Sequence, residues 1–242
     1  MTVATPPDQH LTMNEATADT TPPAAVLEWT HWGRVRYADA LRRQLDRHAA
    51  VLAGALPPAI YTLEHEPVIT LGKRGQDSDV LVPSADLQRQ GVDVVRVERG
   101  GEATWHGPGQ LVVYVVLRLE DAKLGVSDLV RGLADVIRQE LRLFGVEAAY
   151  DAERPGLWVN GRKITAVGMR ITRGVSLHGA ALNVNNDLRA FAQIVPCGIP
   201  DAGVTSVAQE TGREPGLHGL GARIASRFAE RIGYTLVERL AD

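Results

Sequence analysis

The 242-residue sequence contains one cysteine and no long apolar segment. A single cysteine excludes an intramolecular disulfide framework and a cysteine-rich zinc site, which agrees with a reducing compartment. The longest apolar run, Leu111 to Leu117, has seven residues and is too short to cross a bilayer. The N-terminus lacks a basic segment followed by an apolar core, so we expect no secretory signal, no membrane partner and a cytoplasmic location.

Common catalytic motifs are missing as well. The chain has no serine in a nucleophile elbow, no phosphate loop ending in Gly-Lys-Ser or Gly-Lys-Thr, no dinucleotide fingerprint and no His-x-x-x-His pair. A net charge of −3 argues against general nucleic-acid binding. We therefore expect no metal site, no cofactor and no nucleic-acid partner.

The composition divides the chain into a tail and one large unit. Residues 1–23 are rich in Thr, Pro, Ala and acidic residues and show no periodicity, so we expect a disordered tail. The rest has the apolar and charged content of a soluble globular protein. We expect residues 24–242 to form a single catalytic domain.

Hydrophobic spacing predicts three helices. The first covers 34–53, and its expected apolar face consists of Leu41, Leu45, Ala49 and Leu52. The second is capped by Ser127, ends before Gly145 and is assigned to the core rather than to a site. The third ends at Gly233. Short strands are expected at 59–63, 68–71, 94–98, 111–117 and 234–237.

Two alternating runs, 163–171 and 175–183, flank Thr172-Arg173-Gly174 and predict a β-hairpin. With a period of two, Lys163, Thr165 and Val167 are expected on one face, and Ile164, Ala166 and Gly168 on the other. A glycine inside a strand often marks a place where another backbone or a ligand comes close.

The lone cysteine, Cys197, lies in the sequence Ile-Val-Pro-Cys-Gly-Ile-Pro. Free cysteines are usually buried and behave as small hydrophobes, so a packing role is one interpretation. The flanking prolines and glycine indicate a constrained turn, however, which is a poor place for a core residue. This context favours a nucleophile.

A glycine-rich stretch from Arg99 to Gln110 precedes the most apolar expected strand, 111–117. Its backbone N–H groups would suit an oxyanion, a carbonyl or a phosphate. The alternative is an ordinary turn, which would not need the polar side chains interleaved with the glycines. A second loop, Gly72-Lys73-Arg74-Gly75, is either a mobile cationic loop or an ordinary solvated one.

A nucleophilic thiol needs a positive neighbour, because a free thiol with a pKa of about 8.5 is only slightly ionised at pH 7. Lys163 can supply that charge and can then serve as acid and base. Without a nucleotide site, such an enzyme must start from an activated acyl donor. A thioester fits, since exchange onto a cysteine sulfur is nearly isoergic and transfer to an amine runs downhill.

Four motifs in this order resemble the octanoyltransferases of lipoate biosynthesis, over about 26–233. They are Arg99-Gly-Gly-Glu-Ala-Thr-Trp-His-Gly-Pro-Gly-Gln110, Gly161-Arg-Lys-Ile-Thr-Ala-Val-Gly168, His178-Gly-Ala-Ala-Leu-Asn183 and Pro196-Cys-Gly-Ile199. The resemblance implies an α/β (α+β) fold, a single mixed-sheet domain similar to the catalytic domain of biotin and lipoate protein ligases. It also implies acyl transfer as the first step of protein lipoylation.

The same resemblance assigns residues and partners. Cys197 would carry the acyl group as a thioester, with Lys163 as its catalytic partner. The acyl donor would be octanoyl-acyl carrier protein, and the acceptors would be lipoyl domains of 2-oxoacid dehydrogenase complexes and the glycine cleavage H protein. The implied substrate-binding residues are Arg99, Gly100, Gly101, Glu102, Ala103, Thr104, Trp105, His106, Ala166, Val167, Gly168, Gly179, Ala180 and Ala181.

Three questions stay open at this point. His106 and His178 either line the pocket or complete a Cys-His pair, and the family pattern favours the lining role. Arg162 is expected to contact a partner protein. The rival functions are an ATP-dependent lipoate or biotin ligase, which would not need the cysteine, and a non-catalytic module that binds the acyl chain or the lipoyl domain.

Overall fold

The computed structural model describes residues 25–195 and 203–241, and its largest element is a mixed sheet of eight strands. The expected tail and Cys197 lie outside the described residues. The strand order across the sheet is β11-β1-β2-β6-β10-β9-β8-β7. β11, β1 and β2 are parallel to one another, whereas the other neighbours are antiparallel. Bounds are β1 Val26–Val35, β2 Ala59–His65, β6 Gln110–Val116, β7 Ala149–Asp151, β8 Gly156–Val159, β9 Arg162–Thr172, β10 Val175–Asn183 and β11 Thr235–Glu238.

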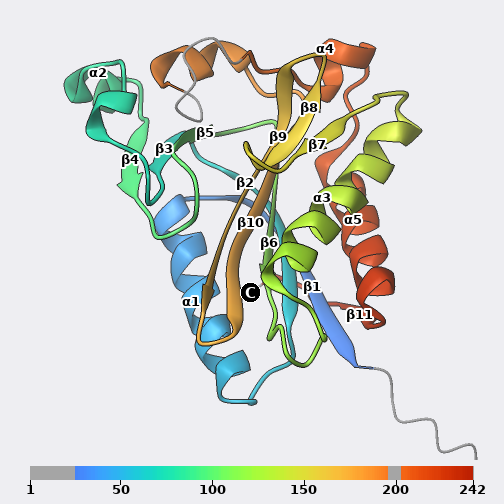
Figure 1. The fold of residues 1–242 in the computed structure, drawn as a ribbon. Helices are drawn as coiled ribbons and strands as arrows, with labels where there is room; N and C mark the ends of the chain where they lie inside the picture. The colour runs from blue at the N-terminus through green and yellow to red at the C-terminus, as the bar shows by residue number, and fades with distance from the viewer. Residues whose placement is uncertain (1–24, 196–202, 242) are drawn as a thin grey trace, which may run out of the picture.

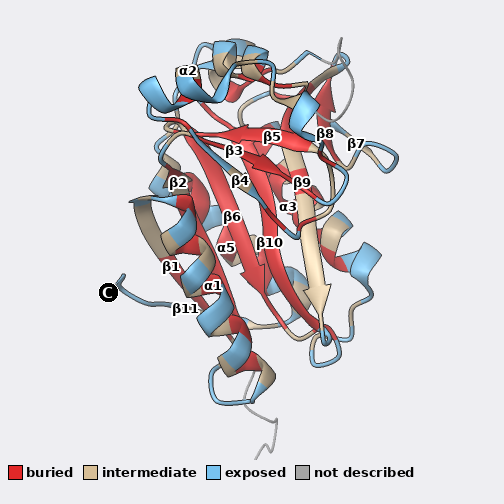
Figure 2. Cartoon of the chain, turned by 90° about the vertical axis from the view of Figure 1, so that its left-hand side faces the viewer, coloured by how far each residue is buried: buried red, intermediate tan, exposed pale blue. Residues whose placement is uncertain are grey.

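Helices cover both faces of this sheet (Figure 1). Helices α3 (Val126–Leu143) and α5 (Leu217–Ile232) pack on one face, and α1 (Tyr37–Leu52) packs on the other. Strands β6 and β10 between them are buried along their whole length (Figure 2). The expected strand at 111–117 is confirmed as β6, which is buried on both faces, because Val113 contributes to one core and Val112 to the other.

A smaller three-stranded sheet extends one end of the molecule (Figure 1). Its order is β4-β3-β5, with bounds β3 Val68–Leu71, β4 Asp93–Arg96 and β5 Ala103–His106. The expected strands at 68–71 and 94–98 are confirmed, whereas β5 lies inside the glycine-rich stretch that showed no strand pattern. Short helices complete the described chain at η1 Asp77–Asp79, α2 Ser84–Arg89, η2 Leu188–Gln193 and α4 Val207–Thr211.

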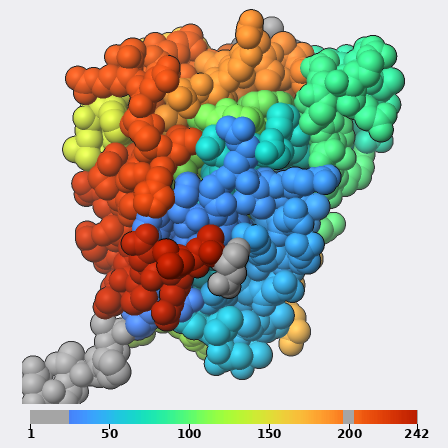
Figure 3. All heavy atoms as spheres, turned by 180° about the vertical axis from the view of Figure 1, so that it is seen from behind, coloured from blue at the N-terminus to red at the C-terminus, as the bar shows by residue number. Residues whose placement is uncertain are grey.

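The two ends of the described chain meet at the edge of the large sheet. β11 pairs in parallel with β1, and the C-terminal residues lie beside the N-terminal strand and helix on the back of the molecule (Figure 3). Helix α5 ends as predicted, because Gly233 follows it with φ 73°, the left-handed conformation that glycine adopts at little cost. The described helices include none that is long and apolar enough to span a bilayer.

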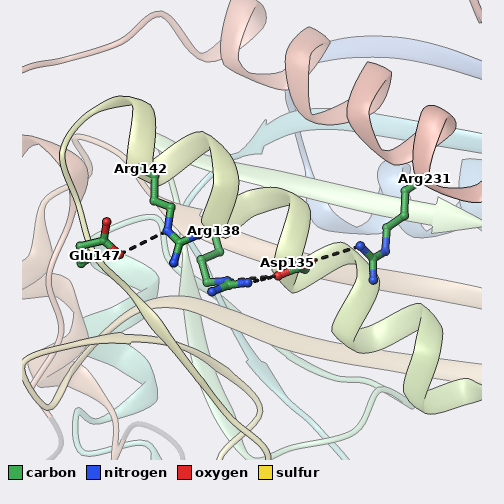
Figure 4. Close-up of polar contacts among 5 residues, drawn as sticks. All are labelled: Asp135, Arg138, Arg142, Glu147 and Arg231. Carbon is green, nitrogen blue, oxygen red and sulfur yellow. Dashed lines mark hydrogen bonds and ion pairs between the residues drawn. The ribbon is translucent and has the colours of Figure 1, made fainter.

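Helices α3 and α5 are joined by ion pairs as well as by apolar packing (Figure 4). The carboxylate of Asp135 on α3 contacts Arg138 on the same helix and Arg231 on α5. One turn farther along, the fully buried Glu140 lies 2.7 Å from Arg223 and 2.5 Å from Arg227. Every carboxylate in this contact therefore has at least one guanidinium partner.

Two of the predicted helices differ in detail from the structure. Helix α3 starts at Val126, and its N-cap is Gly125, whose N–H donates to the Asp128 carboxylate at 2.9 Å, so the assignment of Ser127 as the cap is wrong. The apolar face expected for α1 is also wrong, since Leu45 is 46% exposed. The residues of α1 that are buried are Tyr37, Ala40, Gln44, His48 and Val51.

Candidate active site

A cavity of about 480 Å³ lies beside the β6-β10-β9 part of the sheet. The glycine-rich turn 99–104 forms one wall, and strands β9 and β10 form another. The N-terminal end of α1 and two residues of α3, Val126 and Val130, close the rest. The interpretation of α3 as core alone is therefore wrong, because one edge of this helix faces the cavity.

The turn at 99–102 is held by backbone contacts that only glycines allow. A Cβ atom on Gly72 would lie 2.3 Å from the Gly101 carbonyl oxygen, and one on Gly168 would lie 2.9 Å from that of Gly100. The Gly100 N–H donates to the Met169 carbonyl at 3.1 Å, which joins the turn to β9. The expectation that a glycine inside the hairpin marks a close backbone approach is confirmed at Gly168.

The buried side chain of Arg99 stabilises the same turn through hydrogen bonds. Its guanidinium donates to the Thr70 carbonyl at 2.9 Å, to the Thr70 hydroxyl at 2.7 Å and to the Glu102 carbonyl at 3.0 Å. The side chain thereby links β3 to the glycine-rich turn. Its positive charge also acts on the histidines of the cavity wall.

The loop at 72–75 is tied to this turn. The N–H groups of Lys73 and Arg74 donate to carbonyls of the 99–102 turn, and Arg74 pairs with Glu102 at 2.7 Å. Lys73 lies 3.6 Å from Glu98. Of the two interpretations, the ordinary solvated loop agrees better with the structure, because the side chains of Lys73 and Arg74 are exposed while their backbone N–H groups are bonded to the turn.

Histidines His106 and His178 both line the cavity, and both are neutral at pH 7. Burial, with His65 and Arg99 nearby, lowers the pKa of His106 well below its usual range. Burial also lowers the pKa of His178 to about 4, and the charges of Arg99 and Arg170 act in the same direction. The two imidazoles therefore offer hydrogen-bonding groups and no charge.

His106 is fixed by a chain of buried polar side chains. Its Nδ1 lies 2.7 Å from the Gln110 side-chain oxygen, so this nitrogen carries the proton and donates. The Gln110 amide in turn donates to Asn183 at 2.9 Å. His178 has φ 62°, and its N–H donates to the Gln44 side chain at 2.9 Å, which explains why a polar residue occupies the buried face of α1.

Lys163 on β9 is 7% exposed and lines the cavity. Its N–H donates to the Gly203 carbonyl at 2.9 Å, and its carbonyl accepts from the Thr205 N–H at 3.0 Å. The described chain resumes at Gly203, so the residues that follow the undescribed segment run beside Lys163.

A β-bulge overturns the predicted alternation of β9. Trp158 pairs with Lys163 but Leu157 pairs with Thr165, so Ile164 is an extra residue. Ile164 and Val167 consequently belong to the same core, although strict alternation placed them on opposite faces. Lys163 and Ala166 both line the cavity for the same reason.

The structure brings most of the predicted residues together around one cavity. Its lining includes Arg99, Gly100, Gly101, Glu102, Ala103, Thr104, His106, Lys163, Ala166, Val167, Gly168, Gly179, Ala180 and Ala181. Trp105 differs, because its indole packs against Phe191 in a separate apolar cluster. Arg162 forms an ion pair with Glu210 at 2.8 Å within the chain, where a partner contact was expected.

Several lining residues were missed by sequence reasoning. Tyr37 stands at the start of α1, where the helix was expected to show a different face. Glu153 and Arg154 come from the turn before β8, which carries no motif. Within 25–195 and 203–241, no three His, Asp or Glu side chains come together as metal ligands.

The family model and the curated relatives that match this chain agree on one family. The model of the lipoyl protein ligase A/B catalytic domain matches residues 36–229. The octanoyltransferase of Dictyoglomus thermophilum is 37% identical over 201 residues, which cover 83% of this chain and 85% of that protein. The octanoyltransferase of Nitratidesulfovibrio vulgaris is 44% identical over 180 residues, which cover 74% and 82% of the two chains.

Solved structures with the same fold are lipoate-protein ligases. A crystal structure of lipoate-protein ligase A bound with ATP superposes with a TM-score of 0.69 at 18% identity and covers 90% of each chain. A putative lipoate protein ligase from T. acidophilum with bound lipoic acid gives a TM-score of 0.68 at 16% identity, covering 90% of each chain. The predicted mixed α/β fold is confirmed.

Proposed function

The chain belongs to the lipoyl protein ligase A/B catalytic domain family and is an acyltransferase, and from this premise we propose that it transfers an octanoyl or lipoyl group from acyl carrier protein to lipoyl domains. The acceptors would be the lipoyl domains of 2-oxoacid dehydrogenase complexes and the glycine cleavage H protein. Residues 24–242 would act as one catalytic domain. This reaction is the first step of protein lipoylation.

The observation that carries the proposal is the placement of Lys163 on the wall of the cavity. The volume of about 480 Å³ falls in the range of pockets that bind small molecules. The wall combines the glycine-rich turn with apolar residues of α3 and β9, such as Val130 and Ile171. A short acyl chain would therefore meet apolar side chains while its carbonyl meets polar backbone.

We assign the nucleophile to Cys197, which lies outside the described residues. Support comes from the sequence around it and from Gly203, six positions later, whose carbonyl accepts the Lys163 N–H. In the resting enzyme the sulfur is a thiolate and Lys163 is protonated. A lysine beside a thiolate stabilises that charge in the way that activated cysteines require.

The proposed reaction has two steps. The Cys197 thiolate attacks the thioester carbonyl of the donor, a new carbon–sulfur bond forms, and the carrier leaves as a thiol after taking a proton from Lys163. The lysine amine of the lipoyl domain then attacks the Cys197 thioester and gives a proton to Lys163. The amide forms and the Cys197 thiolate leaves, which restores the starting state.

Intact-protein mass tests the covalent step. After incubation with octanoyl-acyl carrier protein, the mass should rise by one octanoyl group, and Cys197→Ala should abolish this shift. Turnover should fall by orders of magnitude in that variant. The assignment is unambiguous because the sequence has no other cysteine. Normal acyl transfer by Cys197→Ala would contradict the thioester route, and a requirement for ATP would favour a ligase.

Lys163→Arg separates the two roles of the lysine. A guanidinium can hold the thiolate but cannot accept a proton from the incoming amine. We expect this variant to form the acyl-enzyme and to stall before amide formation. Lys123→Arg is the matched control, because Lys123 is exposed and lies outside the cavity lining.

A further inference from the structure

The side chain of Lys163 ends on the face of an indole. Its Nζ lies 4.7 Å from the ring centroid of Trp158, within the distance at which an ammonium is attracted to an aromatic face. The two residues are cross-strand partners on β9 and β8. Trp158 is 6% exposed and is not part of the cavity lining, so it cannot act on a substrate directly.

We propose that Trp158 is a positioning residue, which holds the Lys163 ammonium in one place by a cation–π contact. The proposal rests on the proposed function, because it assigns a role to the lysine. It adds a residue outside the cavity lining and gives the end of a side chain with four rotatable bonds a defined contact.

The residues around the contact favour this placement of the Lys163 side chain. Gly156 leaves room for the lysine stem, since a Cβ atom there would lie 3.3 Å from Lys163 Cε and 2.3 Å from the Thr165 carbonyl oxygen. The bulge at Ile164 turns Lys163 to the same side as Ala166. The backbone bonds to Gly203 and Thr205 fix the main chain, and the indole contacts the end of the side chain.

Arg154 holds the indole itself. The Trp158 ring N–H donates to the Arg154 carbonyl at 3.2 Å, and the Arg154 guanidinium lies 4.2 Å from the ring centroid. That guanidinium is in turn fixed by Asp151 at 2.6 Å. The ring therefore has a fixed orientation before the lysine meets it.

An indole face suits the chemistry better than a carboxylate would. It attracts an ammonium, yet it carries no net charge, so the field of the cation at the thiolate is retained. An ion pair at this position would cancel much of that field. The contact thus orients the lysine without weakening the charge on which the nucleophile depends.

Three variants test the proposal in the full chain. Trp158→Leu keeps an apolar side chain and removes the π face, Trp158→Phe keeps a smaller face, and Trp29→Leu removes another buried indole, one that donates to Thr62 on β2. We expect Trp158→Leu to lower kcat about tenfold with KM for the lipoyl domain unchanged. Trp158→Phe should recover most of the rate, and Trp29→Leu should keep the wild-type kcat per folded molecule.

A double-mutant cycle distinguishes positioning from packing. Alkylation of Cys197 by iodoacetamide at pH 7 should slow about tenfold in Trp158→Leu, but should not slow further when Trp158→Leu is added to Lys163→Ala. Equal slowing in both backgrounds would overturn the proposal. So would a wild-type rate in Trp158→Leu while Lys163→Ala is slow. If Lys163→Ala itself alkylates at the wild-type rate, the proposed function fails first.

Fluorinated tryptophans at position 158 give a test that does not depend on folding of the leucine variant. Added fluorines weaken the negative face of the ring and leave its shape nearly unchanged. The logarithm of the alkylation rate should fall steadily with the number of fluorines. A rate that does not respond to fluorination would show that the ring acts by its shape alone, and the proposal would be wrong.

Discussion

The α3–α5 contact buries a charged carboxylate, whereas the histidines at the cavity are buried in their neutral form. In the helix contact, the Glu140 side chain is fully buried between two guanidinium groups. At the cavity, His106 and His178 line the wall and His65 packs against His106, and burial lowers the pKa values of all three histidines until they are neutral at pH 7.

One region buries a charged group and the other buries neutral groups because their surroundings differ. A buried charge costs several kcal/mol unless a partner of opposite charge remains beside it, and α3 and α5 keep such partners in place. Beside His106 and His178, the nearby charge of Arg99 is itself positive, so a protonated imidazole there would be repelled. Neutral imidazoles avoid this cost, and they leave the wall able to form hydrogen bonds.

The largest predicted effect is a loss of stability in acid that originates in the buried histidines at the cavity. Burial lowers the pKa of His65 and of His178 to about 4, from about 6.5 when unfolded. The unfolded state therefore binds more protons between pH 6.5 and 4, and the free energy of unfolding falls as pH is lowered through that window. Each histidine should account for about 3 kcal/mol.

Urea unfolding between pH 7.5 and 4 measures this effect. His65→Gln keeps a hydrogen-bonding side chain that does not titrate, so it should flatten the pH dependence by the contribution of one histidine. The glutamine has to replace two contacts, the bond from the Tyr114 hydroxyl to His65 at 2.7 Å and the bond from His65 to the Val35 carbonyl at 3.0 Å. An unchanged slope would mean that these imidazoles are not buried as described.

The second effect, of about 2 kcal/mol, is expected at the helix contact. Glu140→Gln keeps the shape and removes the charge between Arg223 and Arg227, which are themselves partly exposed and can turn to water. Glu147→Gln is the control, because Glu147 pairs with Arg142 while 76% exposed and should cost less than about 0.5 kcal/mol. Equal costs would break the contrast between the buried and exposed pairs.

A feature of the fold or of the site was predictable from the sequence where residues adjacent in the chain determine it. The hairpin was predictable, because two alternating runs flank a short break whose Gly174 adopts its positive φ of 79° at little cost. The helix end at Gly233 was predictable for a similar reason. Local chemistry alone determines both features.

Other features depend on contacts between distant segments. The buried face of α1 carries Gln44 and His48 because their partners are a backbone N–H of β10 and the Thr172 carbonyl, which hydrophobic spacing cannot reveal. The bulge at Ile164 depends on how β8 pairs with β9. Trp158 received no role for the same reason, since its significance comes from the lysine across the strand.

The third prediction compares two glycines with equally close neighbours. A Cβ atom on Gly168 would lie 2.9 Å from the Gly100 carbonyl oxygen, and one on Gly132 would lie 2.9 Å from the Arg231 side chain. A backbone carbonyl cannot move without shifting the 99–102 turn, whereas the end of an arginine can. Gly168→Ala should therefore cost about 1 kcal/mol and reduce acyl-enzyme formation severalfold.

Gly132→Ala should be neutral or stabilising by up to about 1 kcal/mol, because alanine has the higher helix propensity. Melting temperature and single-turnover acylation measure the two outcomes. If both variants lose stability equally, the helix contact is as rigid as the cavity wall, and the contrast between the regions is wrong.

The smallest effect concerns surface charge on the 72–75 loop and on the β9–β10 hairpin. Lys73, Arg74 and Arg162 each have a carboxylate within 4 Å, whereas among the described residues Arg170 and Arg173 have none. If the protein partners are acidic, these two arginines should speed their encounter, because unpaired rim charges act mainly on association rate. Arg170→Gln combined with Arg173→Gln should lower kcat/KM for the lipoyl domain about threefold at low salt. The difference should disappear near 0.5 M salt, where screening shortens the Debye length to about 4 Å.

Lys73→Gln should have a smaller effect, since Glu98 already offsets its charge at 3.6 Å. A double variant as fast as the wild type at low salt would show that the partner approaches from another side of the molecule.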